Sequence, residues 1–298
     1  EITTRLVGSE MCIRDRDIGG SSIKYALLNE TGEFIEKGST IAPHQSIEQF
    51  VEVIGELYDK YAEQIVGMAI SMPGAIDPQK GFAYTGGAYK YIKDMEIVKI
   101  LQERCPLPIT IGNDAKCAAN AEVGFGCLKD VDDAAVIILG TGIGGCIVRD
   151  GKVHIGKHFS SGEFSWMRTN GEDGNNPECV WAATNGIPGL LKAVQESVGT
   201  KEQYNGKEIF EMANSGDKKV LAGLDKFCNR LAVQIYNLQA LFDPEKIAIG
   251  GGISAQPLLL ELVEKHIEEM YQTGLKANSP IARPVVCLLY TSPSPRDA

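Results

Sequence analysis

The sequence predicts an α/β protein of two related domains with a cleft between them. Strand-like and helix-like patterns alternate along the chain, which is typical of sheets covered by helices. Each half opens with a strand and a glycine-rich hairpin, at Asp17–Leu28 and again at Val136–Val148. No low-complexity linker separates the halves. We therefore place the boundary in the helix after Asp114, with domains at residues 17–115 and 116–286.

Composition narrows the class of partner and the compartment. The chain has 298 residues and a formal net charge of −10, which argues against nucleic acid or an anionic membrane surface, since both require a basic face. The eight cysteines include no CxxC pair, no apolar run is long enough to cross a bilayer, and no signal peptide is visible. These features predict reduced thiols in a cytoplasmic protein.

The two terminal segments do not fit the rest of the sequence. The runs LVGSEMCIRDR near the start and CLLYTSPSPRD near the end both correspond to one stretch of sequencing-adapter DNA, read on its two strands. We expect residues 1–16 and 287–298 to be adapter artefacts and set them aside. Most of the first strand and a C-terminal piece are then expected to be missing.

The first half begins with a β-hairpin, Ile23–Leu28 and Phe34–Lys37, across the turn Asn29–Glu33. Apolar residues at helical spacing predict an amphipathic helix over Ile47–Gln64. The apolar run Val66–Met72 predicts a buried strand, and the Pro-Gly pair after it predicts the turn where the strand ends.

The same half continues with a helix, a strand and a helix. Ile97–Arg104 has a helical pattern, and prolines at 106 and 108 end it. Ile109–Ile111 predicts a short strand that leads into Gly-Asn-Asp, and the alanine-rich Ala115–Val123 predicts the next helix.

The second half repeats this alternation with longer helices. Apolar runs between glycine-rich turns predict strands, and apolar residues at helical spacing predict helices. The expected strands are Ala134–Leu139, Cys146–Arg149, Lys152–His154 and Lys246–Ile249, and the expected helices are Gly186–Val198, Gly206–Ala213, Lys218–Phe242 and Pro257–Tyr271.

The first motif that carries chemistry is the run DIGGSSIK. Gly19 and Gly20 lack side chains, so main-chain N–H groups there and at Ser21 could approach a phosphate. Lys24 could add positive charge, and Asp17 could hold magnesium directly or through water. A Gly-Gly pair in a hairpin is also compatible with a simple turn.

The second motif is a glycine loop between two strands, and we expect it to clasp phosphates. Its candidate residues are Gly140, Thr141, Gly142, Gly144 and Gly145. The loop resembles the dinucleotide-binding GxGxxG only superficially, because a β-like run follows it in place of a helix. A tight β-turn is the structural alternative.

The third motif is a strand that runs into three glycines before a helix. Gly251 and Gly252 could let a flat ring or a ribose lie against the main chain. A plain connection between strand and helix is the alternative.

Two further motifs supply polar side chains. Asp114 follows a short strand and could accept a hydroxyl proton, and Asn113 could bind a neighbouring hydroxyl. The alternative is that the Asn-Asp pair merely caps the next helix. Glu163, among small residues, could bind sugar hydroxyls or could be an ordinary surface glutamate.

Together and in this order, the five motifs resemble the ROK family (repressors, open reading frames and sugar kinases) of the actin-like ATPase superfamily. The resemblance covers nearly all of Asp17–Val286. It implies two actin-like, ribonuclease H-like domains around an interdomain cleft, and ATP with Mg²⁺ as the phosphoryl donor. It also implies that Asp114 is the catalytic base, that Asn113 and Glu163 bind sugar, and that the three glycine motifs bind phosphates and adenosine.

The departures from the family pattern are informative. Many members have GEIGH, whereas this chain has GEFSW with Trp166 in place of the histidine, and its zinc region keeps only Cys179. One thiol cannot build a tetrahedral site, so we expect no structural zinc. The zinc-less pattern resembles the β-glucoside kinase branch, which also implies a sugar contact at Gly87. Trp166 could form an aromatic platform for a sugar, or it could pack in the core.

The expected reaction is transfer of the ATP γ-phosphoryl group to a sugar hydroxyl, at C6 of a hexose or β-glucoside. The expected partner is a small-molecule sugar substrate. A homodimer is compatible with this function. Two alternatives remain open. One is a sugar-sensing transcriptional regulator with a DNA-binding segment ahead of Asp17, and the other is a protein that binds ATP and sugar without catalysis.

Overall fold

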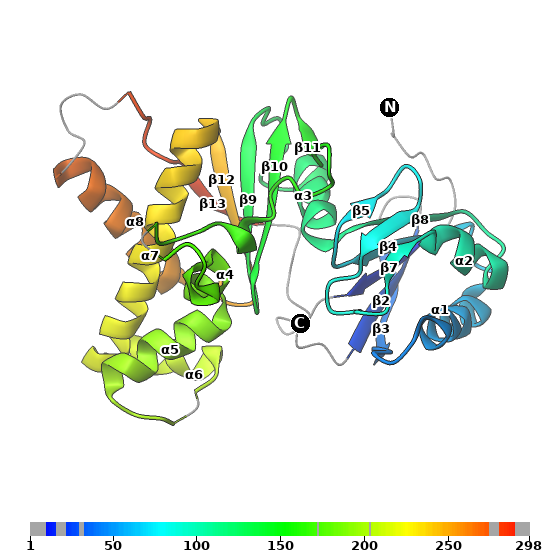
Figure 1. Cartoon of the computed structure of the whole chain (residues 1–298), viewed down its shortest axis with the longest axis horizontal. Helices are drawn as coiled ribbons and strands as arrows, with labels where there is room; N and C mark the ends of the chain where they lie inside the picture. Colours follow the sequence, from blue (N-terminus) through cyan, green and yellow to red (C-terminus); the bar gives the residue numbers. More distant parts are fainter. Residues whose placement is uncertain are drawn as a thin grey trace. The chain divides into compact units, whose positions relative to one another are not determined.

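A computed structural model describes residues 10–15, 22–29, 33–171, 173–202, 204–273 and 280–289. The chain divides into two units (Figure 1). Unit 1 comprises Glu1–Cys117 with Lys157–Ser160, and unit 2 comprises Ala118–Gly156 with Ser161–Ala298. The division falls inside a helix, between Cys117 and Ala118. No helix in these described ranges combines the length and the apolar character that crossing a bilayer requires.

Unit 1 is built on a five-stranded sheet of order β3-β2-β1-β4-β8. Its first three strands are antiparallel neighbours, whereas β1, β4 and β8 run parallel. The strands are β1 (Glu10–Asp15), β2 (Ser22–Leu28), β3 (Phe34–Ile41), β4 (Gly67–Met72) and β8 (Ile109–Asn113).

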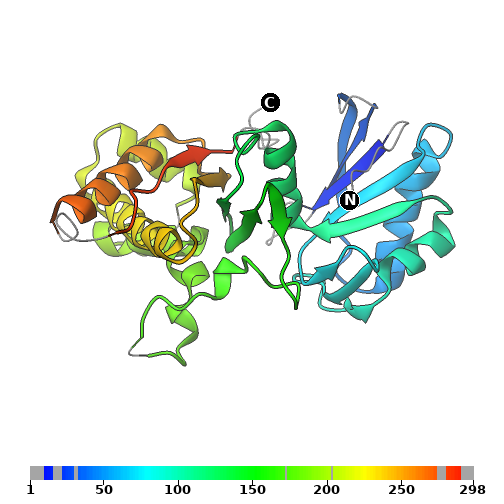
Figure 2. The same cartoon turned by 90° about the horizontal axis from the view of Figure 1, so that it is seen from above.

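Two helices pack on this sheet, α1 (Ile47–Tyr61) and α2 (Ile97–Arg104) (Figure 2). Alternate residues of β4 belong to the same buried cluster as the apolar stripe of α1. Ser46 starts α1 by accepting the Gln49 amide hydrogen on its side chain. A small antiparallel sheet joins β4 to α2, with β5 (Ile76–Asp77), β6 (Phe82–Thr85) and β7 (Lys93–Met95).

Unit 2 has a second five-stranded sheet, of order β11-β10-β9-β12-β13. Within it β9, β12 and β13 are parallel, and β10 and β11 are antiparallel. The strands are β9 (Ala134–Leu139), β10 (Ile143–Arg149), β11 (Lys152–His154), β12 (Lys246–Gly251) and β13 (Val286–Leu288).

This second sheet is covered on both faces, which explains why β9 is apolar at every position. Ala135, Ile137 and Leu139 belong to a large cluster with the C-terminal helices. Ala134 and Val136 belong to a separate cluster with α3 (Asp114–Phe125). Strands buried on both faces lose the alternation of apolar and polar residues.

The helical layer of unit 2 consists of five helices and two short 3₁₀ turns in the described ranges. Helix α7 runs through the middle of the layer and packs against α5 and α8 (Figure 1). The elements are η1 (Phe164–Trp166), η2 (Pro177–Cys179), α4 (Trp181–Asn185), α5 (Ile187–Val198), α6 (Gly206–Asn214), α7 (Lys218–Phe242) and α8 (Pro257–Thr273).

The structure confirms the mixed α/β class and the bounds of α2, β9, β11 and α7. Several other boundaries were wrong. Strand β10 begins at Ile143, inside the expected glycine loop, because Gly144 and Gly145 pair with β9. Strands β8 and β12 likewise continue into their glycine motifs. Helix α5 begins one residue after the expected Gly186, and the short helix α4 before it was not expected.

Both segments set aside in the sequence analysis contribute strands. Residues 10–15 form β1 between β2 and β4, and residues 286–288 form β13 at a sheet edge. Main-chain hydrogen bonds build such ladders, so an extended segment of suitable length can complete one whatever its origin. The adapter origin of these segments stays a prediction, which sequencing of the gene would check.

Candidate active site

The carboxyl edge of the unit 1 sheet brings several predicted residues together. Strands β4 and β8 are parallel, and Met72 at the end of β4 pairs with Asn113 at the end of β8. A loop that starts with Pro73-Gly74 follows β4, and helix α3 begins directly after β8. In open α/β sheets, ligands bind beyond the carboxyl ends of parallel strands. This edge is therefore one candidate half-site.

Asn113 is buried and connects the loop after β4 to the first turn of α3. Its Nδ2 donates to the carbonyl oxygen of Gly74 (3.0 Å), and its Oδ1 accepts the amide hydrogen of Lys116 (3.2 Å). The second bond caps the start of α3, as the structural alternative proposed. The first bond fixes the loop after β4 against the end of β8. Asn113 thus has a structural task beside any contact with substrate.

Asp114 is the first residue of α3 and is half-buried. Its Oδ1 accepts the amide hydrogen of Ala115 (2.8 Å). Burial raises the pKa of the Asp114 carboxyl, although the Ala115 amide and the nearby charge of Lys116 act in the opposite direction. A carboxylate with a raised pKa is a better proton acceptor than an ordinary aspartate.

Gly87 lies against the same loop that Asn113 contacts. Its φ of +59° belongs to the left-handed region, and a Cβ there would lie 2.7 Å from the Cβ of Pro73. The Thr85 hydroxyl accepts the amide hydrogen of Ala75 (3.0 Å), which ties the two loops together. Asn113, Asp114 and Gly87 therefore belong to one continuous edge of unit 1.

The carboxyl edge of the unit 2 sheet has a different character. Leu139 at the end of β9 pairs with Gly251 at the end of β12. Gly251 has a φ of +104°, and a Cβ at this position would clash with the carbonyl oxygen of Leu139. The loop after β9 and the loop that continues to exposed Gly252 thus start side by side.

The loop after β9 consists of Gly140, Thr141 and Gly142, which we call the glycine loop. It closes on itself through a bond from the Gly140 amide to the carbonyl oxygen of Gly142 (3.1 Å). The amide of Ile187, at the start of α5, donates to the carbonyl oxygen of Gly140 (2.8 Å). Thr141 is exposed. The other two glycines of the motif lie in β10, not in the loop.

Glu163 and Trp166 flank the 3₁₀ turn η1. Glu163 is half-buried, whereas Trp166 is 73% exposed. The alternative that Trp166 packs in the core was therefore wrong. Trp181 is the buried indole of unit 2, and it packs against Phe164 with 5.7 Å between the ring centroids.

Part of the first phosphate motif lies outside the described residues, namely Asp17, Gly19, Gly20 and Ser21. Lys24 is described. It lies in β2, half-buried, where it pairs with Arg14 and Ser39.

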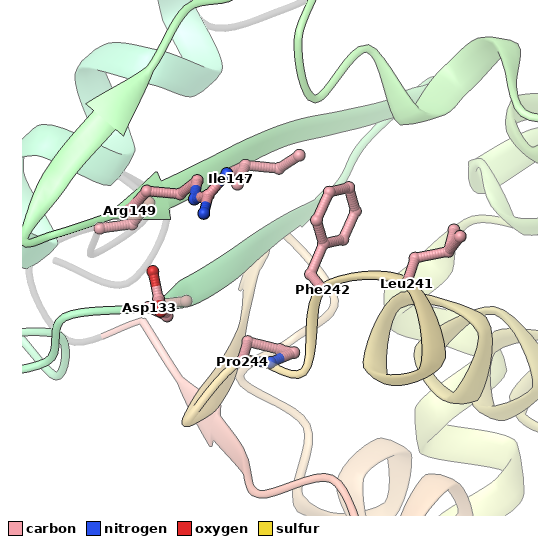
Figure 3. A pocket seen from close by; sticks show the side chains of 8 residues that line it. Asp133, Ile147, Arg149, Leu241, Phe242 and Pro244 are labelled. Atoms are coloured by element: carbon pink, nitrogen blue, oxygen red, sulfur yellow. The ribbon is translucent and has the colours of Figure 1, made fainter. Parts of the chain in front are cut away.

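A separate cavity of about 130 Å³ lies at the other ends of β9 and β10 (Figure 3). Asp133 and Arg149 border it on one side, and Leu241, Phe242 and Pro244 border it on the other. Because β9 begins beside this cavity and ends at the glycine loop, the cavity is not part of the candidate site.

Several residues that hold these loops were not among the predicted site residues. Thr85, Gly74 and Ile187 contact site loops through bonds to or from the main chain. The hydroxyl of Ser165 bonds to Ile143 beside the glycine loop. Ser165 belongs to the GEFSW run, but nothing in that run indicates a partner at residue 143.

Comparison with known proteins places these features in a family. The family described as "ROK family" matches residues 14–286. A β-glucoside kinase from Listeria monocytogenes is 31% identical over 256 residues, which cover 85% of this chain and 86% of the relative.

Two solved structures are similar over most of the chain. A ROK family protein from Streptococcus pneumoniae TIGR4 in complex with sucrose has a TM-score of 0.80 and 28% identity, covering 94% of this chain and 92% of that one. A ROK family transcriptional regulator, a homolog of the E. coli MLC protein, has a TM-score of 0.80 and 23% identity, covering 95% of this chain and 74% of that one. The second likeness shows the fold alone.

These findings confirm the family, the fold class and the sugar-kinase enzyme class expected from the sequence. They do not concern single site residues, whose roles stay predictions. The chain belongs to the ROK family.

Proposed function

We propose that this chain transfers the γ-phosphoryl group of ATP to a sugar hydroxyl, at C6 of a hexose or β-glucoside. The observation that carries the proposal is the unit 1 edge. There a half-buried aspartate with a raised pKa, Asp114, begins a helix directly after Asn113 at the ends of parallel strands, and Gly87 lies against the loop after β4. The 31% identity to a β-glucoside kinase supports the substrate class.

Asp114 acts as the general base in this proposal. The Ala115 amide holds Oδ1 and so fixes the carboxylate, which accepts the hydroxyl proton as the sugar oxygen attacks phosphorus. Because burial raises its pKa, the rate should decline on the acidic side at a pH above the ordinary range of an aspartate. The dependence of kcat/KM on pH measures this pKa in the free enzyme.

The glycine loop and Gly251–Gly252 supply the nucleotide contacts in this proposal. Main-chain N–H groups suit phosphate oxygens, and close main-chain approach suits the ribose and base. In the described part of the chain, no three His, Cys, Asp or Glu side chains gather in a set that could hold a metal ion. Mg²⁺ commonly binds through one or two carboxylates plus substrate phosphates, and Asp17 is the proposed carboxylate. When bound, Mg²⁺ would neutralise phosphate charge.

Glu163 and Trp166 supply further sugar contacts in this proposal. A half-buried carboxylate can accept hydrogen bonds from two neighbouring hydroxyls. The exposed indole offers an apolar face to one side of a sugar ring or to the aglycone of a β-glucoside.

An assay of ATP consumption tests the proposal. Cellobiose, glucose, N-acetylmannosamine and fructose would each be supplied with ATP and Mg²⁺, and the product would be analysed by mass spectrometry. We expect ADP release that depends on sugar, strongest with the β-glucoside, and a product heavier by one phosphoryl group. Absence of sugar-dependent ADP release with every sugar would refute the kinase proposal.

A sugar-sensing regulator is the second candidate, because the fold also matches a ROK transcriptional regulator. It predicts sugar binding without ADP release. The net charge of −10 over the 298 residues disfavours DNA binding by this chain. The same assay, combined with calorimetry of sugar binding, separates the two candidates.

A further inference from the structure

The side chain of Ser165 makes two hydrogen bonds to a single residue of β10. Its Oγ accepts the amide hydrogen of Ile143 (3.0 Å) and donates to the carbonyl oxygen of Ile143 (2.9 Å). Strand β11 pairs with β10 only from Ile147 onward. Ser165 therefore satisfies the main-chain groups of Ile143, in the part of β10 that β11 does not pair.

The position of these two residues in the chain gives the contact its interest. Ile143 directly follows Gly142, the last residue of the glycine loop. Ser165 lies two residues after Glu163 and directly before Trp166. Under the proposed function, one hydroxyl thus joins the segment that binds phosphates to the segment that binds sugar.

The two segments are packed with no room for intervening side chains. A Cβ at Gly145 would overlap the ring of Phe164, and a Cβ at Gly162 would lie 2.8 Å from the Cα of Cys146. A Cβ at Gly142 would lie 3.0 Å from the Ser165 Oγ. Because η1 rests directly on the main chain of β10, a displacement of one segment is passed to the other.

We propose that Ser165 is a positioning residue that couples sugar binding at Glu163–Trp166 to phosphate binding at the glycine loop. This inference rests on the proposed function. A sugar held by Glu163 restrains η1, and the two bonds of Ser165 then restrain Ile143. A loop that is already restrained loses less conformational entropy when it binds phosphate. Such coupling is reciprocal, so a nucleotide should favour sugar binding equally.

The test measures the affinity of AMP-PNP with Mg²⁺ by calorimetry, with and without a saturating sugar that the wild type phosphorylates. We expect the sugar to raise the affinity of the wild type by about 10-fold, within the range typical of coupled sites. In Ser165→Ala this ratio should fall below about 2-fold, while the affinity without sugar changes little. Ser165→Thr keeps the hydroxyl and should keep the ratio.

Ser215→Ala is the matched control. It also removes a serine hydroxyl that donates to a carbonyl oxygen, that of Met212 (2.7 Å), but at the exposed end of α6. The ratio in this control should equal that of the wild type. Ser165→Cys, similar in shape with a weaker donor, replaces Ser165→Ala if the alanine variant does not fold, and it should also lower the ratio.

The outcomes separate the two proposals. A wild type without sugar-dependent ATP consumption contradicts the proposed function. An active wild type whose sugar does not raise nucleotide affinity contradicts the coupling role, as does a folded Ser165→Ala or Ser165→Cys variant that keeps the full ratio. Loss of the ratio in Ser165→Thr as well would show that shape, not the hydroxyl, carries the effect, and would also overturn the inference.

Discussion

The carboxyl edges of the two sheets differ in which part of the polypeptide they offer. The unit 1 edge carries side-chain groups, chiefly the Asn113 amide and the Asp114 carboxylate. The unit 2 edge consists mainly of main chain, because Gly140, Gly142 and Gly251 carry no side chains. Proton transfer requires a titratable side chain, whereas phosphate oxygens are well served by main-chain N–H groups.

This difference shows that two related sheets can be adapted to different chemistry through the residues at and after the ends of their strands alone. Both edges are formed by parallel strands ending at paired residues, Met72 with Asn113 and Leu139 with Gly251. Substitutions at the unit 1 edge and substitutions at the unit 2 edge should therefore affect different kinetic constants.

The largest effect is expected for Asp114→Asn, which removes the proposed base and keeps the shape of the side chain. We expect turnover to fall at least ~100-fold, the scale of general base catalysis, with sugar affinity retained. Steady-state kinetics and calorimetry measure the two quantities. Asp94→Asn, an exposed aspartate with positive φ in unit 1, is the matched control and should change neither. Near-normal turnover of Asp114→Asn would remove Asp114 from the role.

Gly251→Ala should affect only the unit 2 edge, the proposed nucleotide site. The added Cβ would clash with the Leu139 carbonyl oxygen at a φ of +104°, and such strain costs roughly 1–2 kcal/mol. We expect the KM for ATP to rise by about 10-fold, since 1.4 kcal/mol corresponds to a factor of ten, and the KM for sugar to change little. Gly216→Ala shares the positive φ with no atom within 4 Å, so it shows the cost of conformation without the clash. Equal changes in both KM values would contradict the division of roles.

Gly87→Ala should give the opposite result at the unit 1 edge, the proposed sugar site. The Cβ would press on Pro73, at 2.7 Å from its Cβ, and displace the loop that Asn113 holds. We expect the KM for sugar to rise by about 5-fold, which corresponds to roughly 1 kcal/mol. The KM for ATP should stay within about 2-fold of the wild-type value. Gly151→Ala, which has positive φ and open surroundings in unit 2, is the control. A rise in the KM for ATP alone would contradict the assignment of Gly87 to the sugar site.

The smallest effect concerns stability below neutral pH. The amides of Asp133 and Asp132 donate to Glu245 and lower the pKa of its carboxyl below the ordinary 4.5. The stabilisation is therefore complete above pH 4.5 and declines as the pH falls through the lowered pKa. Glu245→Gln should lower the unfolding temperature at pH 7 and make little difference at pH 3. Exposed Glu261→Gln is the control, and a difference that grows toward acid would contradict the sign.

Local patterns predicted most of the fold because they depend on neighbours in sequence. Helix α7 and strand β9 have the expected bounds, since helical spacing and an uninterrupted apolar run are visible in the sequence itself. The predicted start of β10 was wrong because Gly144 and Gly145 belong to the strand. Their pairing with β9, not their local propensity, places them there.

The candidate site was predicted less completely, for a physical reason. The residue types at 113, 114 and 163 indicate chemistry, so sequence alone could name them. Ser165 bonds to a residue 22 positions away, and Ile187 bonds to Gly140 across a longer separation. Such contacts are fixed by tertiary packing, and no spacing rule within a segment reports them.

Strand β3 has a practical consequence for handling the protein. It lies at the outer edge of the unit 1 sheet, and Phe34, Ile35 and Ile41 are more than half exposed along it. Unpaired strand edges with apolar side chains recruit other extended chains, and the charges of Glu36 and Lys37 are the features here that oppose this. At high protein concentration, aggregation should therefore begin through β3, and Ile41→Lys should reduce it.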